Sequence, residues 1–152
     1  MCLRWRSAAA LFSLLLAAVG CVTSPITGRE QLLLFPEGME IQLGLQSFQK
    51  ILSKSKISKD RAKNAALRRV GRRVAAATGK GNYKWKFVVI ENKTPNAFAL
   101  PGGKVAVHTG MFPVARSDAG LATVVAHEVA HAIIRHGGER MSQDLIVQVG
   151  LA

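Results

Sequence analysis

The chain has 152 residues, of which 49% are hydrophobic and 20% are charged. This length and apolar content suffice for one domain with a hydrophobic core, and they exclude a largely disordered chain. The formal net charge is +12 at pH 7, and no internal repeat or low-complexity tract is present.

The first twenty residues predict an export signal. Arg4 and Arg6 precede an apolar run that ends at Gly20 and Cys21, and this run is shorter than an ordinary membrane span of about 20 residues. The ending resembles a bacterial lipoprotein signal, which implies that residues 1–20 are removed and that Cys21 is lipidated. A plain secretory signal cut nearby and an uncleaved anchor are the alternatives.

Cysteine usage agrees with export and a lipid anchor. Once Cys2 is removed with the signal, Cys21 is the only cysteine, so no internal disulfide can form. Val22 stands where an aspartate would favour retention in the inner membrane. In a bacterium with two membranes, we therefore expect the protein at the periplasmic face of the outer membrane, bound through the lipid.

After the signal, residues 21–36 are predicted as a linker and residues 37–152 as one folded domain. Apolar residues recur at helical spacing over residues 37–54 and again over residues 60–77. Asp60 can cap the second of these helices.

The second predicted helix carries a dense basic cluster. Its members are Arg61, Lys63, Arg68, Arg69, Arg72 and Arg73. A solvated helix face accounts for such a cluster, and a surface for nucleic acid or anionic lipid is the alternative. We expect no nucleic-acid partner.

Two stretches predict a small sheet. Residues 83–91 alternate and then become apolar, and residues 97–110 suggest a strand, a Pro-Gly-Gly turn and a second strand. We expect residues 104–108 to present an exposed edge near residues 127–131, where a further backbone, such as that of a substrate, could pair. The candidate substrate-binding residues are Gly103, Lys104, Val105 and Ala106. An ordinary strand in a small sheet is the alternative.

A long Ala-rich helix should begin near Ser117 or Asp118, run to about Arg135, and kink or end at Gly137 and Gly138. A last helical piece follows it. Together the elements predict an α+β fold in which helices pack on a small β-sheet and the long helix is central.

The long helix contains the motif His-Glu-x-x-His at His127, Glu128 and His131. Residues four apart are neighbours on one helix face, so both imidazoles can bind one zinc ion. Glu128 beside them can act as the general base for a water molecule at the metal. The surrounding apolar residues predict a buried helix, in which such polar groups need partners. Two core histidines bonded to carbonyls are the alternative.

Catalytic zinc usually takes three protein ligands. His136 lies five residues past His131, which on a continuous helix places it about 140° away. Glu139 lies too far along the axis, and Asp144 has the same difficulty. The spacing therefore assigns no third ligand.

The stretches "NAFALPGGKVAVHTGMF" and "LATVVAHEVAHAIIRHGGER" resemble the HtpX / Oma / CAAX-prenyl-protease family of zinc metallopeptidases. The segment "CVTSPITGREQLLL" resembles its periplasmic lipoprotein branch. The resemblance implies that residues 37–152 are a metallopeptidase domain that is incomplete at its C-terminus, the N-terminal part of a zincin-like domain. It also implies one zinc ion and endopeptidase activity on envelope proteins, in protein quality control. His127 and His131 match the family's zinc ligands and Glu128 its general base. The family's third ligand is a glutamate on a later helix, which no residue here matches.

The sequence is also compatible with two other functions. The chain could be a truncated, inactive lipoprotein that binds zinc weakly or serves as an interaction module. It could instead bind anionic lipid or nucleic acid through the basic cluster, with binding that falls steeply as salt rises.

Overall fold

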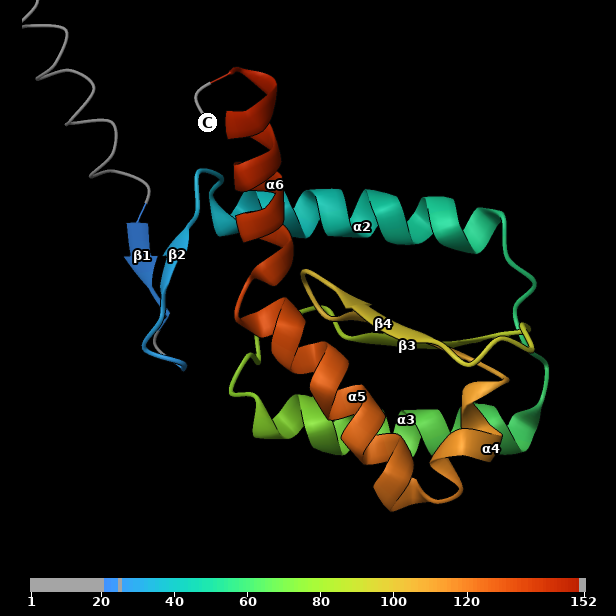
Figure 1. Cartoon of the computed structure of the whole chain (residues 1–152). Coiled ribbons are helices and arrows are strands. Elements are labelled where there is room, and N and C mark those ends of the chain that lie inside the picture. The colour runs from blue at the N-terminus through green and yellow to red at the C-terminus, as the bar shows by residue number, and fades with distance from the viewer. Residues whose placement is uncertain (1–20, 25, 151–152) are drawn as a thin grey trace, which may run out of the picture. The chain divides into compact units, whose positions relative to one another are not determined.

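The computed structural model describes residues 21–24 and 26–150 (Figure 1), and the predicted signal segment lies outside these residues. The described chain divides into two compact units. The larger comprises residues 37–137, and the smaller combines residues 21–24 and 26–36 with residues 138–150.

The larger unit contains a three-stranded sheet in the order β3-β5-β4. Its elements are α2 (Glu37–Ser53), α3 (Arg61–Ala77), β3 (Lys86–Ile90), β4 (Ala97–Leu100), β5 (Lys104–His108), α4 (Met111–Ala115) and α5 (Asp118–Ile133). β3 pairs with β5 in parallel, and β4 pairs with β5 antiparallel. β5 is therefore the central strand, and β4 is an outer one.

Helices cover both faces of this sheet (Figure 1). Because successive strand residues point to opposite faces, Val88 and Ala106 pack with Phe48 of α2, whereas Val89 and Val105 face α3 and α5. The predicted α+β fold, with helices packed on a small sheet, is confirmed, and one face of the motif helix contributes Leu121, Val125 and Val129 to the core.

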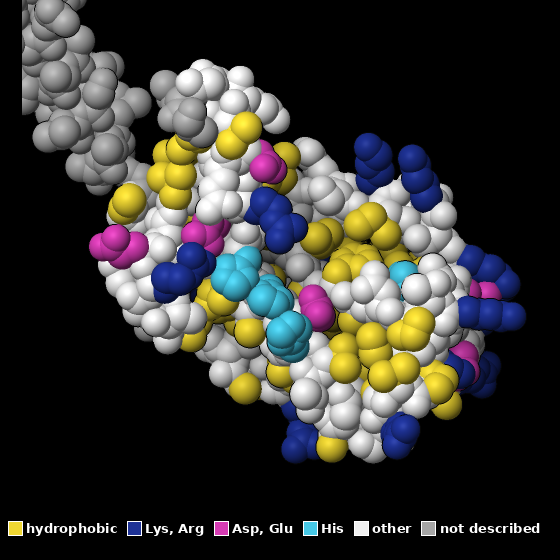
Figure 2. Space-filling model, viewed as in Figure 1, with side chains coloured by type: hydrophobic (Ala, Val, Ile, Leu, Met, Phe, Trp, Pro, Cys, Tyr) yellow, Lys and Arg dark blue, Asp and Glu magenta, His cyan; other side chains and the backbone are white. Residues whose placement is uncertain are grey.

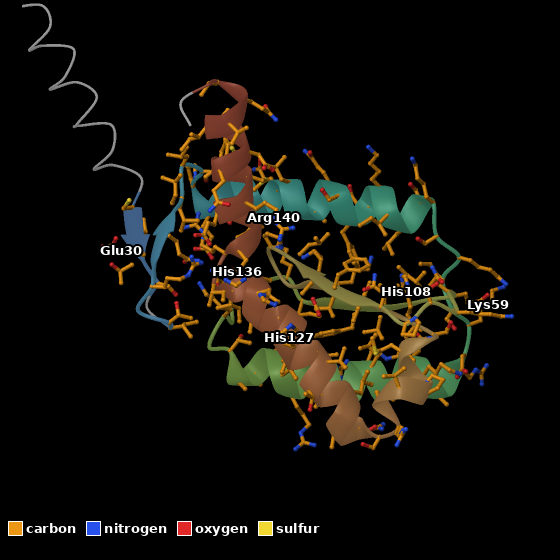
Figure 3. The ribbon with its side chains drawn as sticks, in the orientation of Figure 1. Glu30, Lys59, His108, His127, His136 and Arg140 are labelled. Atoms are coloured by element: carbon orange, nitrogen blue, oxygen red, sulfur yellow. The ribbon has the colours of Figure 1, made fainter. Side chains whose placement is uncertain are left out.

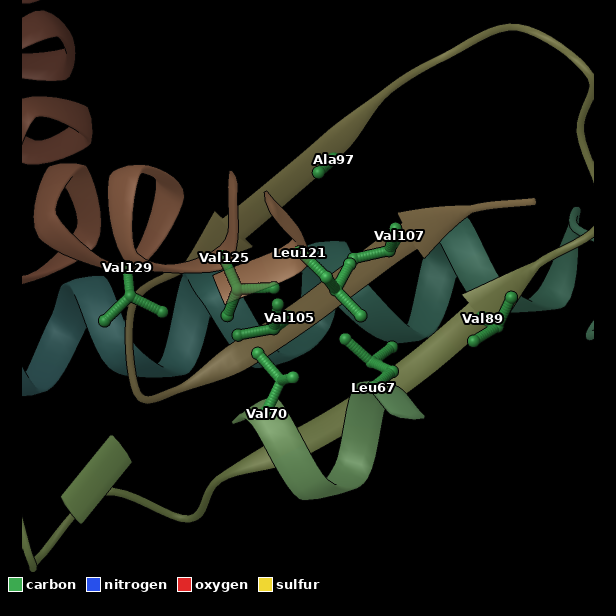
Figure 4. Packing of buried hydrophobic residues seen from close by; sticks show 9 residues of the cluster. All are labelled: Leu67, Val70, Val89, Ala97, Val105, Val107, Leu121, Val125 and Val129. Carbon is green, nitrogen blue, oxygen red and sulfur yellow. The ribbon is translucent and has the colours of Figure 1, made fainter. Parts of the chain in front are cut away.

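The main core lies between the sheet, α3 and α5 (Figure 4). Its buried members are Leu67, Val70, Val89, Ala97, Val105, Val107, Leu121, Val125 and Val129. Full burial of one such Val or Leu side chain contributes about 1.5–3 kcal/mol. α3 approaches β3 closely because it has Gly71 at the contact, where a Cβ atom would lie 2.4 Å from the Phe87 ring.

The smaller unit contains β1 (Cys21–Thr23), β2 (Glu30–Leu32) and most of α6 (His136–Gln148). Where the sequence predicts a linker, β1 and β2 pair antiparallel. Arg29 contacts α6 through a bidentate ion pair with Glu139, with Nη1–Oε1 and Nη2–Oε2 distances of 2.9 and 2.5 Å. Cys21 is exposed. No helix within the described ranges has the length and apolar character that a membrane span requires.

The basic cluster of α3 is mostly solvated. All of its members are exposed except Lys63, which is half-buried. Lys63 pairs with Asp60 and Arg69 pairs with Asp118. This exposure agrees with a solvated helix face.

Candidate functional site

α5 is anchored at its first turn. Ser117 is extended and its side chain accepts a hydrogen bond from the Gly120 amide at 3.1 Å, as an N-cap does. Arg69 of α3 donates two hydrogen bonds to the Asp118 carboxylate, at 2.7 and 2.8 Å. The hydrogen bond from Arg69 lowers the pKa of Asp118. A Cβ atom on Gly120 would lie 2.0 Å from the Ala115 carbonyl oxygen, so only glycine fits there.

α5 buries one face only. Leu121, Val125 and Val129 point into the core, whereas Ala126 and Ala130 are exposed. The sequence-based expectation of a buried helix is therefore wrong for this outer face. In a layered unit of this size, a helix buries the face that packs against the sheet. Small apolar residues on the opposite face, here Ala126 and Ala130, are exposed in the described part of the chain.

The two motif histidines face one another on α5. His127 is exposed and His131 is half-buried, and their Nε2 atoms lie 3.1 Å apart. Two imidazole nitrogens bound to one tetrahedral zinc ion, each about 2.0–2.1 Å from the metal, lie about 3.3–3.4 Å apart. The pair therefore fits two adjacent positions of a zinc ion with little movement. Figure 3 labels His127 on α5 and His136 where α6 begins.

Glu128 is half-buried between the exposed and the buried face of α5. Figure 2 shows a row of histidine side chains at the surface with an acidic side chain beside it. A carboxylate beside two histidines can accept a proton from a water molecule that enters this place.

In the part of the chain that the structure describes, this pair is not joined by a third metal donor. Within residues 21–24 and 26–150, no three His, Cys, Asp or Glu side chains are grouped so that they could hold a metal ion. The Glu139 carboxylate is bonded to Arg29 in the smaller unit. His136 contacts His131 through Nδ1, at 2.6 Å from Nδ1 of His131, on the side of the ring opposite to Nε2.

The contact of His136 depends on a break in the helix, which lies about two residues before the predicted one at Gly137 and Gly138. α5 ends at Ile133, and Arg135 has a left-handed backbone with φ of 59°. Gly137 lies within α6 instead of ending a helix. On a continuous helix His136 would point away from His131; this expectation is wrong, because the helix is broken between Ile133 and His136.

Arg135 and Glu40 were also missed from the sequence. Arg135 donates to Glu40 of α2, with Nη2–Oε1 and Nε–Oε2 distances of 2.6 and 3.2 Å. Glu40 is 1% exposed, and the pKa of Arg135 is raised by its hydrogen bond to this carboxylate. The sequence signal that could have revealed this pair is the acidic residue Glu40 within the apolar pattern of residues 37–54.

The predicted exposed edge at residues 104–108 is wrong. β5 is paired on both sides, and Gly103, Lys104, Val105 and Ala106 are all buried. Lys104 donates from Nζ to the carbonyl oxygens of Lys84 and Gly102, at 2.5 and 2.8 Å. The long-range parallel pairing with β3, which local sequence does not reveal, encloses β5 and leaves no open backbone edge there.

Comparison with known proteins matches this chain to one peptidase family and to two kinds of protease. The family model described as Peptidase family M48 matches residues 61–151, more than half of the chain. Mitochondrial metalloendopeptidase OMA1 of Schizosaccharomyces pombe is 47% identical over 74 residues, which are 49% of this chain and 22% of that protein. The Beta-barrel assembly-enhancing protease of Escherichia coli K12 is 28% identical over 99 residues, 65% of this chain and 20% of that protein. The chain spans about a fifth of the length of these curated relatives.

Proposed function

The chain belongs to Peptidase family M48, and we propose that it provides part of the active site of a zinc-dependent metalloendopeptidase. His127 and His131 hold the metal, and Glu128 is the general base. The observation that carries this proposal is the 3.1 Å separation of the two Nε2 atoms, which suits two neighbouring positions on one ion.

Each of the three residues has a separate task. A bound zinc ion supplies Lewis acidity, which activates water and polarises a peptide carbonyl. His127 and His131 direct Nε2 lone pairs to one point in front of α5. The Glu128 carboxylate accepts a proton from the attacking water and returns it to the leaving amine nitrogen.

The test is Glu128→Gln in the full-length protein, with Glu30→Gln as a matched control at an exposed position of β2. We expect Glu128→Gln to reduce peptide hydrolysis by about 10²–10⁴-fold and to leave zinc binding unchanged. A chelator should abolish wild-type hydrolysis, and added zinc should restore it. Hydrolysis that survives the chelator, or full activity of Glu128→Gln, would contradict the proposal.

A second function has its own support. Since only two donors, Nε2 of His127 and Nε2 of His131, face one another in the described residues and no group of three metal donors forms there, the chain by itself could bind zinc weakly without cleaving peptides. In that case His127→Ala abolishes zinc binding, while neither wild type nor Glu128→Gln turns over any peptide in the presence of zinc.

For the substrate, we propose an extended peptide that adds to β4. This strand packs against α5, and it has no strand partner on its outer side in the described part of the chain. The His108 amide donates to the Asn96 carbonyl, so in the alternation of an antiparallel ladder Phe98 also bonds to β5. The amides of Ala97 and Ala99 then point to the open edge, where a substrate backbone can pair.

Hydrogen exchange tests this proposal within one strand. In the inactive Glu128→Gln protein, a bound peptide should slow exchange of the Ala97 and Ala99 amides. The Phe98 amide, already bonded to β5, serves as the internal control. Unchanged exchange at both alanines, under conditions where the peptide binds, would contradict strand addition.

For location, we propose an exported lipoprotein that is anchored at Cys21, on the periplasmic face of the outer membrane, and acts on envelope proteins in quality control. The exposed position of Cys21 at the start of β1 supports this proposal. The test is the intact mass of native protein extracted from its own cells. A mass that includes acyl chains on residue 21, lost in Cys21→Ser, is expected; an unacylated N-terminus contradicts the anchor.

A further inference from the structure

The junction between α5 and α6 has an unusual backbone. At the C-cap of α5, the Ile134 amide donates to the Ala130 carbonyl at 2.9 Å. The next residue, Arg135, has φ of 59°. Side chains other than glycine seldom adopt this left-handed conformation, and it persists where surrounding contacts enforce it.

A buried carboxylate enforces the turn. Glu40 of α2 is 1% exposed, and it accepts two hydrogen bonds from the guanidinium of Arg135, at 2.6 and 3.2 Å. A planar guanidinium bound at two points is fixed in orientation as well as in position. The partner that stabilises the left-handed residue therefore lies on a different helix, 95 residues earlier in the chain.

The turn brings His136 back over the last turn of α5. The Nδ1 atoms of His136 and His131 lie 2.6 Å apart, and their ring centroids lie 4.8 Å apart. On a continuous helix, side chains five residues apart point about 140° away from each other. The contact thus exists because the helix is broken at Arg135.

The contact lies on the side of the His131 ring that the metal does not use. Nε2 of His131 faces Nε2 of His127 at 3.1 Å. If Nε2 gives its lone pair to the metal, the neutral ring carries its proton on Nδ1. That proton needs an acceptor, and the neighbouring atom at hydrogen-bond distance is Nδ1 of His136.

We propose that His136 is a positioning residue for the metal ligand His131, placed by the Arg135 turn that Glu40 holds. It accepts the Nδ1 proton of His131 and carries its own proton on Nε2. This bond selects the tautomer of His131 and orients its ring, as partners of metal-bound histidines do. The inference rests on the proposed function, because it requires that His131 bind the metal.

The test compares zinc affinity across variants of the full-length protein, by competition with a chromophoric chelator. His136→Ala removes the acceptor, and we expect about 10–100-fold weaker zinc binding. His136→Asn places an amide oxygen near the position of Nδ1, and we expect affinity within a few-fold of wild type. His108→Ala is the control, because His108 lies in β5 and contacts the Thr94 carbonyl.

A second readout separates positioning from a purely structural role. In zinc-loaded wild type, the nitrogen-bound proton of His131 should appear on Nδ1 in a proton–nitrogen correlation spectrum. Its signal should broaden through solvent exchange in His136→Ala and persist in His136→Asn. Circular dichroism verifies that each variant is folded, and if His136→Ala does not fold, His136→Asn against His136→Leu decides.

Three results would overturn the inference. If His136→Ala binds zinc with wild-type affinity while His127→Ala binds it more weakly, His136 has no positioning role, but the metal site is supported. Equal losses in folded His136→Ala and His136→Asn show that the acceptor atom is not what matters. Unchanged affinity in His127→Ala contradicts the metal site itself, and the role of His136 with it.

Discussion

The two ends of α5 differ in how far away their supports lie in the sequence. At the first turn, Ser117 caps Gly120 three residues later, and the nearby Ala115 carbonyl leaves room for glycine alone. At the last turn, Arg135 depends on Glu40, 95 residues earlier. Local contacts thus start the helix, whereas a tertiary ion pair ends it and positions His136.

This difference separates two kinds of functional geometry. The spacing of His127 and His131 follows from the helix itself, so any α-helix here would bring their side chains together. The contact between His131 and His136 requires the left-handed turn, so it depends on the packing of α2. Substitutions at the two ends should therefore have different consequences for the candidate metal centre.

The largest effect should come from Arg135→Met. It leaves the buried Glu40 carboxylate without this cation, and removal of one partner of a buried pair costs about 3–5 kcal/mol of folding free energy. Urea unfolding measures the loss. Zinc affinity should fall as well, because His136 is no longer held against His131.

The double variant Glu40→Met, Arg135→Met is the matched control for that experiment. It removes both charges and should recover most of the lost stability, but it should not recover the zinc affinity of wild type. If Arg135→Met proves no more harmful than loss of the Ser117 cap, the ion pair does not hold this end of α5.

Gly120→Ala should have the next largest effect, at the opposite end. The new Cβ atom meets the Ala115 carbonyl oxygen at 2.0 Å, so the backbone between α4 and α5 must shift, at a cost of about 1–3 kcal/mol. Thermal unfolding gives the measure. Gly81→Ala is the control, because no atom lies within 4 Å of its Cβ position, and a neutral Gly120→Ala would contradict the close contact.

Ser117→Ala removes the side-chain cap and should cost about 1 kcal/mol. Ser117→Asp retains an oxygen acceptor and should remain near wild type in urea unfolding. Since the motif histidines lie more than two turns away, zinc affinity should stay unchanged in both variants. A loss of zinc affinity equal to that of Arg135→Met would erase the distinction between the two ends.

The smallest expected effect is a change in how the free energy of unfolding depends on pH in acid. The pKa of Glu37, which begins α2, is lowered from 4.5 by the Tyr83 hydrogen bond at 2.7 Å and by Lys80. A carboxyl with a lowered folded-state pKa stabilises the protein above its unfolded-state value, and this contribution is lost as pH falls through the folded-state value. The free energy of unfolding should therefore fall less steeply below pH 4.5 in Glu37→Gln than in wild type.

Urea unfolding at a series of pH values measures this difference, which should be smaller than the Ser117→Ala effect because Glu37 is partly exposed. Tyr83→Phe, which removes the hydrogen-bond donor, should flatten the profile in the same direction. Superimposable profiles for wild type and Glu37→Gln would show that this contact does not support α2.

The strands show the same division between local and distant information. Alternation along residues 83–91 and 97–110 predicted strands, and both stretches contain them. Their order was not predictable from alternation, because β5 pairs in parallel with β3, which ends 14 residues before β5 begins. For that reason the predicted exposed edge at residues 104–108 lies in the central strand, whereas β4 is an outer strand.

The sequence by itself determined the helix that carries His127, Glu128 and His131, its start at Ser117 and the α+β class, because each depends on spacing or capping within a few residues. The tertiary structure decided which strand is central, which face of α5 is exposed and where α5 ends. These depend on contacts between residues far apart in the chain, such as Glu40 with Arg135. A pattern within a short window does not specify such partners, since their meeting follows only when the layers pack.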